Sequence, residues 1–139
     1  MPENLGIYSA NEVDTNVNDR TIEGFDEGDF VETERDEAEE FKTRVGAKGD
    51  FTFVKNPNKA GRIIIRLKQN APDNQFLQSL KESEAIFPVE VIARHGYKEI
   101  AKSEAAMISI APRKKHGKEE NMREWVFCVG ELVETDKAL

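Results

Sequence analysis

The chain has 139 residues, of which 38% are hydrophobic and 34% charged, and this length and mixture predict one domain with a core of its own. A net charge of −7 disfavours general binding to DNA, RNA or anionic lipid. The chain has no run of about 20 apolar residues that could span a membrane, and its first residues lack the basic region and apolar segment of a secretory signal. Its single cysteine, Cys128, excludes an intramolecular disulfide.

The beginning of the chain predicts an arm followed by a hairpin. Apolar residues are sparse at first, which indicates an N-terminal arm over residues 1–12, and a strand follows that ends at Val17. Asn18 and Asp19 are a turn signal, so this strand should pair with Arg20–Phe25 as a hairpin.

Three further strands are predicted before the middle of the chain. Alternation predicts a strand over Phe30–Arg35, and short runs predict two more, over Phe41–Val45 and Asp50–Lys55, the last with its two phenylalanines on one face. The acid-rich residues 36–40 fit either a loop or one turn of helix. Because Asn56–Gly61 is a short connector, we expect Asp50–Lys55 to form an antiparallel hairpin with the strand that follows it.

The middle of the chain predicts the structural anchor of the domain. β-Branched residues alternate over Arg62–Gln69, which is typical of a strand with one face in a core, here the face of Ile63, Ile65 and Leu67. Proline suits the first turn of a helix, and Asn or Asp beside it can cap free amides, so Asn70–Asp73 predicts a helix start. An apolar stripe at helical spacing follows, made of Phe76, Leu77 and Leu80. With a second strand over Phe87–Ile92, a short helix should lie against a sheet.

The last third of the chain predicts one undecided element and one strand. Alanines favour a helix over Glu99–Ile110, whereas the apolar residues at its end favour a strand. A charged loop over Pro112–Glu120 leads to Arg123–Val129, the last predicted strand, in which Trp125, Phe127 and Val129 share one face. A C-terminal tail is expected over residues 133–139. Many short strands, frequent turns and one short helix predict a mainly β domain, an antiparallel sandwich or barrel with one flanking α-helix.

Candidate metal ligands and nucleophiles are few. His95, His116 and Cys128 do not stand at zinc spacing, and the carboxylates lack the pattern of a calcium loop. Cys128 alternates with apolar residues in a predicted strand and is interpreted as buried packing material. No phosphate-binding loop, dinucleotide fingerprint or nucleophile elbow is present. The sequence therefore predicts a protein that is not an enzyme, without catalytic residues, metal or cofactor.

Charge is distributed unevenly along the chain. Asp26–Glu40 contains nine acids and one base, Arg35, and Glu32 and Glu34 share one face of a predicted strand. The basic counterpart is Arg113–Lys118. The ordinary interpretation of such runs is a solvated surface. Opposite patches on one small domain also suit head-to-tail association between identical copies.

A resemblance to a known family extends along the chain from about Val13 to about Leu132. Its matches are Arg20–Phe25, Asp26–Asp29, Glu34–Glu37, Arg44–Asp50, Asn56–Gly61, Ala71–Asn74 with Phe76 and Leu77, Phe87 with Pro88, Gly117–Glu119 and Arg123–Trp125. In order and spacing they resemble the tail tube protein of contractile-tailed bacteriophages. The two chain ends match less well, and Pro112–Glu120 is more basic than the family pattern.

The resemblance implies a self-assembling structural protein of tail-tube type. Such proteins resemble a β-sandwich or barrel with a flanking helix; they form hexameric rings by joining sheets edge to edge, and the rings stack into a hollow tube. The tube conducts DNA and penetrates the host envelope. The implied partners are further copies of the chain, the tail sheath, baseplate and tail terminator proteins, and a tape measure protein and DNA held in the lumen without specific binding, with no membrane anchor. The implied location is the virion, after assembly in the host cytoplasm.

Within such a tube, named residues are expected at two kinds of surface. A basic bore would retain DNA, so we expect Glu32 and Glu34 to face the lumen. The residues expected at inter-subunit contacts are Asn56, Pro57, Lys59, Arg113, Lys114 and Lys115. Two alternatives stay open: a tube subunit of a related contractile injection system, such as a bacteriocin or secretion tube, and a monomeric binding module.

Overall fold

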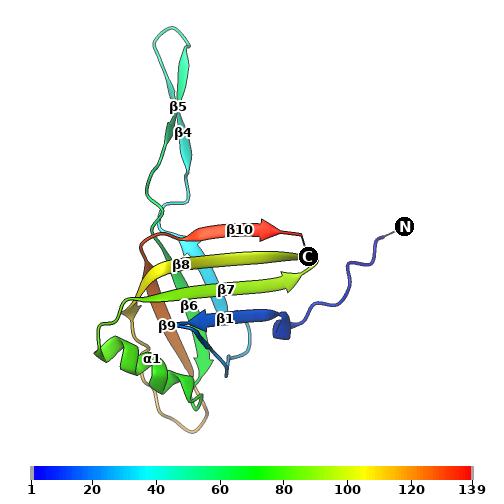
Figure 1. The fold of residues 1–139 in the computed structure, drawn as a ribbon, viewed down its shortest axis with the longest axis vertical. Helices are drawn as coiled ribbons and strands as arrows, with labels where there is room; N and C mark the ends of the chain where they lie inside the picture. Colours follow the sequence, from blue (N-terminus) through cyan, green and yellow to red (C-terminus); the bar gives the residue numbers. More distant parts are fainter. Residues whose placement is uncertain (1, 139) are drawn as a thin grey trace.

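A computed structural model describes residues 2–138 of the chain. Within them it has ten β-strands, one α-helix and one short 3-10 helix (Figure 1). The strands are β1 Val13–Val17, β2 Arg20–Thr21, β3 Val31–Arg35, β4 Phe41–Val45, β5 Phe51–Lys55, β6 Gly61–Lys68, β7 Phe87–His95, β8 Tyr97–Ile110, β9 Met122–Val129 and β10 Val133–Lys137. Helix α1 covers Asp73–Glu82, and the 3-10 helix η1 covers Ala10–Glu12. No helix among the described residues has the length and apolar character needed to cross a membrane.

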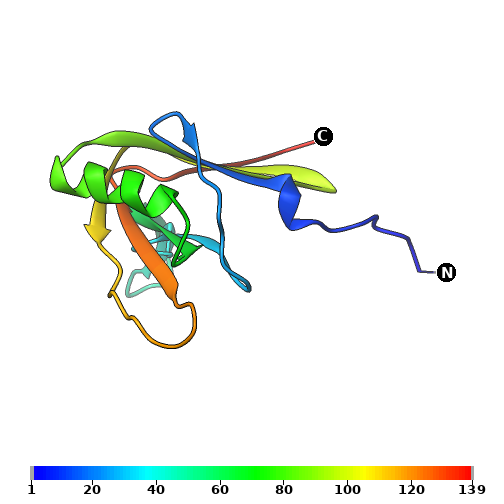
Figure 2. The same ribbon diagram turned by 90° about the horizontal axis from the view of Figure 1, so that it is seen from below.

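Strand β8 joins two layers of sheet. The strands of the body form one antiparallel sheet in the order β2-β1-β7-β8-β9-β6-β3, with β10 added on β8. The first part of β8 lies between β7 and β10, whereas from Ala106 onward β8 pairs with β9. The sheet therefore folds over along β8 into a sandwich, with β1, β7 and β10 in one layer and β9, β6 and β3 in the other (Figure 2).

The core lies between these layers and follows the alternation in the sequence. The residues of β6 predicted to face the core are fully buried: Ile63, Ile65 and Leu67. On β9, Trp125 and Phe127 are buried on the same side, as expected. Phe127 meets Phe87 of β7 edge-on, with 5.8 Å between the ring centroids. The antiparallel sandwich expected from the sequence is confirmed.

Helix α1 closes one end of the sandwich (Figure 1). Its apolar stripe is confirmed, because Leu77 and Leu80 are buried in the core and Phe76 packs against it. The predicted capping is wrong. The helix begins after Pro72, and no side chain caps its free amides.

Asp73, one of the side chains expected to cap the helix, and its neighbour Asn74 bind the helix to the body instead. The buried Asp73 carboxylate accepts a 2.7 Å hydrogen bond from the backbone N–H of Glu23 and pairs with Arg20 at 2.6 Å. The Asn74 side chain accepts a 2.9 Å hydrogen bond from the indole N–H of Trp125. A local sequence pattern does not contain these long-range partners, which outcompete the cap.

The hairpin predicted for Asp50–Lys55 and the strand after it is wrong. Within residues 2–138, β5 pairs with β4 alone, and both edges of β6 are occupied, by β3 and β9. The connector between β5 and β6 folds on itself, since the Asn56 side chain accepts from Asn58 N–H and the Asn58 side chain accepts from Ala60 N–H, each at 3.0 Å. These amides are therefore not available to a ladder between β5 and β6.

Three other expectations are settled by the backbone. The hairpin across Asn18 and Asp19 is confirmed, with β2 limited to two residues. Glu99–Ile110, which the pattern left undecided, belongs to strand β8. The acid-rich residues 36–40 form a loop.

Two predictions near the C-terminus are wrong. Strand β9 is not the last, because residues 133–137, expected in a tail, form β10 on the edge of β8. Cys128 is exposed rather than buried. Trp125, Phe127 and Val129 take the inward positions of β9, so Cys128 points to the outer side of the sheet.

Replacing Gly24 with alanine should destabilise the fold markedly. Gly24 has φ +83°, and a Cβ there would lie 2.6 Å from the Ala71 side chain, so backbone strain and overpacking add to about 3 kcal/mol. Gly28→Ala is the matched control, since φ is +80° but the space is open, and it should cost about 1 kcal/mol. Urea unfolding of both variants measures the difference, and equal midpoints would contradict the packing argument.

Candidate functional site: a projecting hairpin

Strands β4 and β5 form a ribbon that stands away from the sandwich (Figure 1). Their register places Phe41 opposite Lys55, Thr43 opposite Phe53 and Val45 opposite Phe51. An isolated two-stranded hairpin is marginally stable in water, so this ribbon gains from a partner surface.

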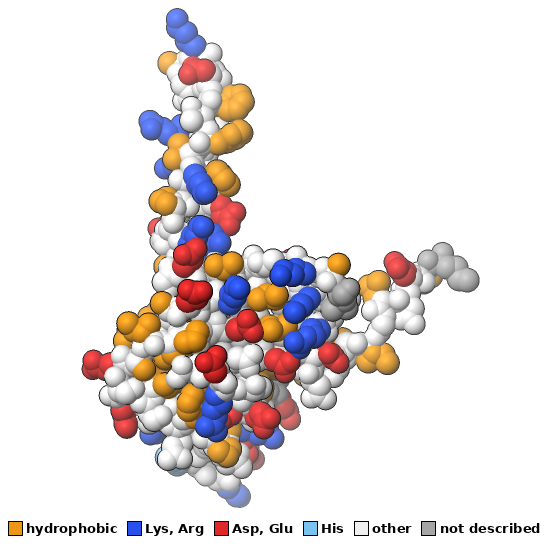
Figure 3. Space-filling view, in the orientation of Figure 1, with side chains coloured by type: hydrophobic (Ala, Val, Ile, Leu, Met, Phe, Trp, Pro, Cys, Tyr) orange, Lys and Arg blue, Asp and Glu red, His pale blue; other side chains and the backbone are white. Residues whose placement is uncertain are grey.

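One face of the ribbon is apolar and open to solvent. Opposed residues of an antiparallel pair share a face, so Phe41, Val45, Phe51 and Phe53 lie together, with exposed fractions of 57%, 67%, 64% and 66%. The rings of Phe51 and Phe53 are 5.5 Å apart. Figure 3 shows hydrophobic side chains gathered along one side of the ribbon, with lysine and arginine side chains on the other. We call these four residues the hairpin face.

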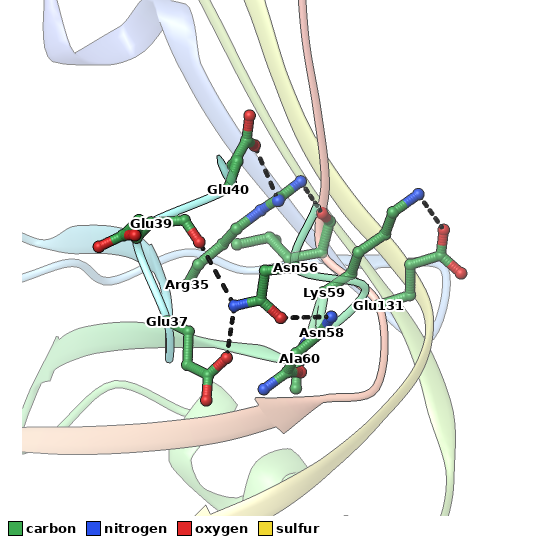
Figure 4. Close-up of polar contacts among 10 residues, drawn as sticks. Arg35, Glu37, Glu39, Glu40, Asn56, Asn58, Lys59, Ala60 and Glu131 are labelled. Carbon is green, nitrogen blue, oxygen red and sulfur yellow. Dashed lines mark hydrogen bonds and ion pairs between the residues drawn. The ribbon is translucent and has the colours of Figure 1, made fainter. Parts of the chain in front are cut away.

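Asn56 holds the two connectors of the ribbon together at its base (Figure 4). Its side-chain amide donates to the Glu37 carboxylate at 2.6 Å and to the Glu39 carbonyl at 3.3 Å. The backbone N–H of Asn56 also donates to the Glu40 carbonyl at 2.8 Å. The incoming connector, residues 36–40, is thereby fastened to the outgoing one.

Arg35 fastens the same base to the C-terminal part of the chain. Its guanidinium pairs with Glu40 at 2.9 Å and donates to the Leu132 carbonyl at 3.4 Å. Lys59 pairs with Glu131 at 3.8 Å (Figure 4). These contacts attach the ribbon base to the body through side chains.

The residues expected at inter-subunit contacts fall near opposite ends of strand β6. Asn56, Pro57 and Lys59 lie at the ribbon base, beside the first residues of β6. The residues Arg113, Lys114 and Lys115 lie in the loop between β8 and β9, and this loop is attached near the last residues of β6. There, Gln69 and His116 side chains meet at 3.1 Å. The structure places the three ribbon-base residues together and the three loop residues together, but the two sets lie apart.

Glu32 and Glu34 lie on strand β3 and are each ion-paired. Glu32 pairs with Arg66 at 2.9 Å, and Glu34 lies 3.4 Å from Arg62. The pKa of Arg66 is raised above its ordinary value because its guanidinium donates a hydrogen bond to the Glu32 carboxylate, with Glu124 as a second acceptor. The two glutamates therefore belong to a mixed row of charges.

The strand edges are a second feature of the site. Among the described residues, β2 and β3 end the strand order, and β10 has β8 as its one partner. An unpaired strand edge presents free N–H and C=O groups to any strand that approaches it. These edges are suited to pairing with another chain.

Sequence reasoning missed that the hairpin face is exposed. Alternating phenylalanine and polar residues indicate an amphipathic strand equally well in a core and on a projecting ribbon. The available signal was that the ribbon's other face is basic, with Lys42 and Arg44, and that its partner strand is its sequence neighbour. Among residues 2–138, no group of three or more His, Cys, Asp or Glu could hold a metal ion.

Comparison with known proteins finds similarity at the level of structure. No family model matches the chain, and no curated protein matches it. The sheath/tube terminator of an extracellular contractile injection system, PVC, superposes with a TM-score of 0.65 at 10% identity, covering 94% of this chain and 97% of the other. This chain therefore shares the fold of that protein.

Two further solved structures share this fold. The tube-terminating cap of the anti-feeding prophage has a TM-score of 0.63 at 7% identity, covering 96% of this chain and 95% of the other. A chain of the PVC sheath-tube complex in its extended state has a TM-score of 0.58 at 10% identity, covering 94% and 91%. At such identities the likeness concerns the fold, with the mainly β sandwich and flanking helix expected from the sequence.

Proposed function

We propose that the chain is a structural subunit that assembles with copies of itself into the hollow tube of a contractile tail or tail-like particle. The observation that carries the proposal is the extent of the fold likeness, which covers 94% or more of this chain in structures described as a sheath/tube terminator, a tube-terminating cap and a sheath-tube complex. Such a role needs no catalytic residue or cofactor.

The geometry of the subunit supports assembly in two directions. Open edges at β3 and β10 suit side-to-side pairing into a hexameric ring, because closure by rotation satisfies every edge. The projecting hairpin suits stacking, because its hairpin face needs a surface that its own body does not provide. The residues expected at inter-subunit contacts lie at the ribbon base and in the basic loop, near the two ends of β6. This placement suits subunits that stack end to end.

In this proposal the particle is a bacteriophage virion with a contractile tail. Its tube would meet sheath, baseplate and tail terminator proteins outside, and a tape measure protein and DNA inside. The acids Glu32 and Glu34 are predicted to face that lumen. A related injection system, such as a bacteriocin or secretion tube, would use the same subunit without DNA.

A second candidate is the terminator or cap that ends a tube. The sheath/tube terminator and the cap superpose with TM-scores of 0.65 and 0.63, above the 0.58 of the sheath-tube chain. A terminator subunit forms one ring and does not propagate, whereas a tube subunit stacks without limit.

Light scattering and negative-stain microscopy of the concentrated protein test the proposal. We expect masses at multiples of 15.7 kDa and hollow tubes in the images. Single rings that do not stack would favour the terminator. A persistent 15.7 kDa monomer at high concentration would contradict both candidates and favour a monomeric binding module.

A further inference from the structure

A second exposed apolar surface lies on the outer side of the layer that contains β9. Register pairs place Ile64 and Ile110 beside Val126, and Met107 beside Cys128. Opposed residues share a face, so these five residues form one surface across β6, β9 and the end of β8. Ile110 is 56% exposed and Cys128 is exposed, Ile64 and Met107 are half-buried, and Val126 is buried at the centre. We call these five residues the outer patch.

Charged side chains border the outer patch along β3 and β6. Glu32 stands opposite Ile64, and Glu34 opposite Arg62, whose other neighbour is Cys128. Glu124 joins the Glu32–Arg66 pair at 2.9 Å. Three glutamates and two arginines make this border acidic overall.

We propose that the outer patch receives the hairpin face of a second copy of the chain. The inference rests on the proposed function and names the surface on which the hairpin docks. The four side chains of the hairpin face are 57–67% exposed, so they do not pack against the sandwich of the same chain. One chain thus carries an exposed apolar face on the ribbon and a partly exposed apolar patch on the body, and a second copy can cover each.

Charge favours this occupant. The ribbon, residues 41–55, carries four cations and one acid, although the whole chain has a net charge of −7. Copies of such a chain repel one another at long range unless the contact brings unlike charges together. The basic ribbon and the acidic border of the outer patch provide that contact.

Size and symmetry also agree. Each strand of the ribbon has five residues and is about 17 Å long, whereas β6 and β9 have eight residues each and span about 27 Å. The ribbon can therefore lie along the outer patch within its length. Because the two surfaces differ, the contact is heterologous and each copy offers one of each, which produces a ring or an open stack.

This docking competes with the predicted lumen position of Glu32 and Glu34. The outer patch and the two glutamates share one face of the layer. If a hairpin covers that face, the two side chains border a protein contact and do not line a bore. One experiment decides between the two placements.

Disulfide cross-linking to the native Cys128 tests the proposal. Thr43 lies on the same side of the ribbon as the hairpin face, opposite Phe53, and Thr52 lies on the other side, opposite Arg44; both are exposed. After oxidation of the concentrated protein with copper–phenanthroline, Thr43→Cys should give a ladder of covalent multimers on a non-reducing gel. Thr52→Cys should stay at the wild-type background, and adding Cys128→Ser to Thr43→Cys should abolish the ladder.

Each other outcome overturns the docking. Equal ladders from Thr43→Cys and Thr52→Cys would show that the ribbon contacts a second copy without presenting the hairpin face to it. Cross-links that persist with Cys128→Ser would place the hairpin elsewhere, and cross-links that form only with another protein added would identify a different partner. Microscopy of the wild type reports separately on the tube: tubes without the ladder refute the docking alone, and a ladder without tubes or rings refutes the proposed function alone.

Discussion

Replacing Phe51 and Phe53 together with serine is expected to abolish self-assembly while the body keeps its fold. The two side chains are 64% and 66% exposed and are not part of the core, so the free energy of unfolding should change little. Burying a phenylalanine side chain in an interface contributes about 1.5–3 kcal/mol, so loss of two weakens each contact by about 3 kcal/mol or more, a factor above about 100.

The matched control for this double variant is Val54→Ser on the other face of the ribbon. It removes an apolar side chain from the same strand but leaves the hairpin face intact. Sedimentation velocity measures assembly, and far-UV circular dichroism during heating measures the fold. Assembly of the double variant at the wild-type concentration would refute a role for the hairpin face.

Phe127→Ala is expected to remove a large part of the stability of the body. Phe127 is fully buried against Phe87, and truncating a core phenylalanine costs about 3–5 kcal/mol. Small domains have about 5–15 kcal/mol in total, so this loss is a large fraction of the stability and the urea midpoint should fall markedly. The only tryptophan, Trp125, stands in the same core and reports urea unfolding by its fluorescence.

The same change on the ribbon provides the control. Phe53→Ala removes an identical group from a position that is 66% exposed, and its cost should stay below about 0.5 kcal/mol. A loss for Phe53→Ala as large as that for Phe127→Ala would mean that the ribbon packs on the body in solution. Such a result would also contradict the exposed hairpin face on which assembly depends.

The inward faces of the strands were predictable because burial alternates with the chain's own period. Ile63, Ile65 and Leu67 on β6, and Trp125 and Phe127 on β9, needed no knowledge of their neighbours. The stripe of α1 was predictable for the same reason. Local periodicity is set by the backbone geometry of one element, and one element is all that a short window of sequence contains.

Strand partners were less predictable because they depend on residues far along the chain. Nothing near Asn56–Gly61 shows that β3 and β9 occupy both edges of β6. The sequence around Cys128 did not predict its exposure either, since an alternating strand does not reveal whether its second face is covered. The same gap explains the hairpin face: the phenylalanines were recognised as sharing a face, but not as facing solvent.

The double membership of β8 has a mechanical consequence. One uninterrupted backbone of 14 residues runs through both layers, so sliding one layer past the other would have to break ladder bonds along its length. Under compression the sandwich should therefore behave as one stiff block. Flexing should concentrate at residues 36–40 and 56–60, where side-chain hydrogen bonds and ion pairs hold the ribbon to the block in place of a continuous strand ladder. A stack of such units would therefore be stiffest within each unit and more compliant at each joint.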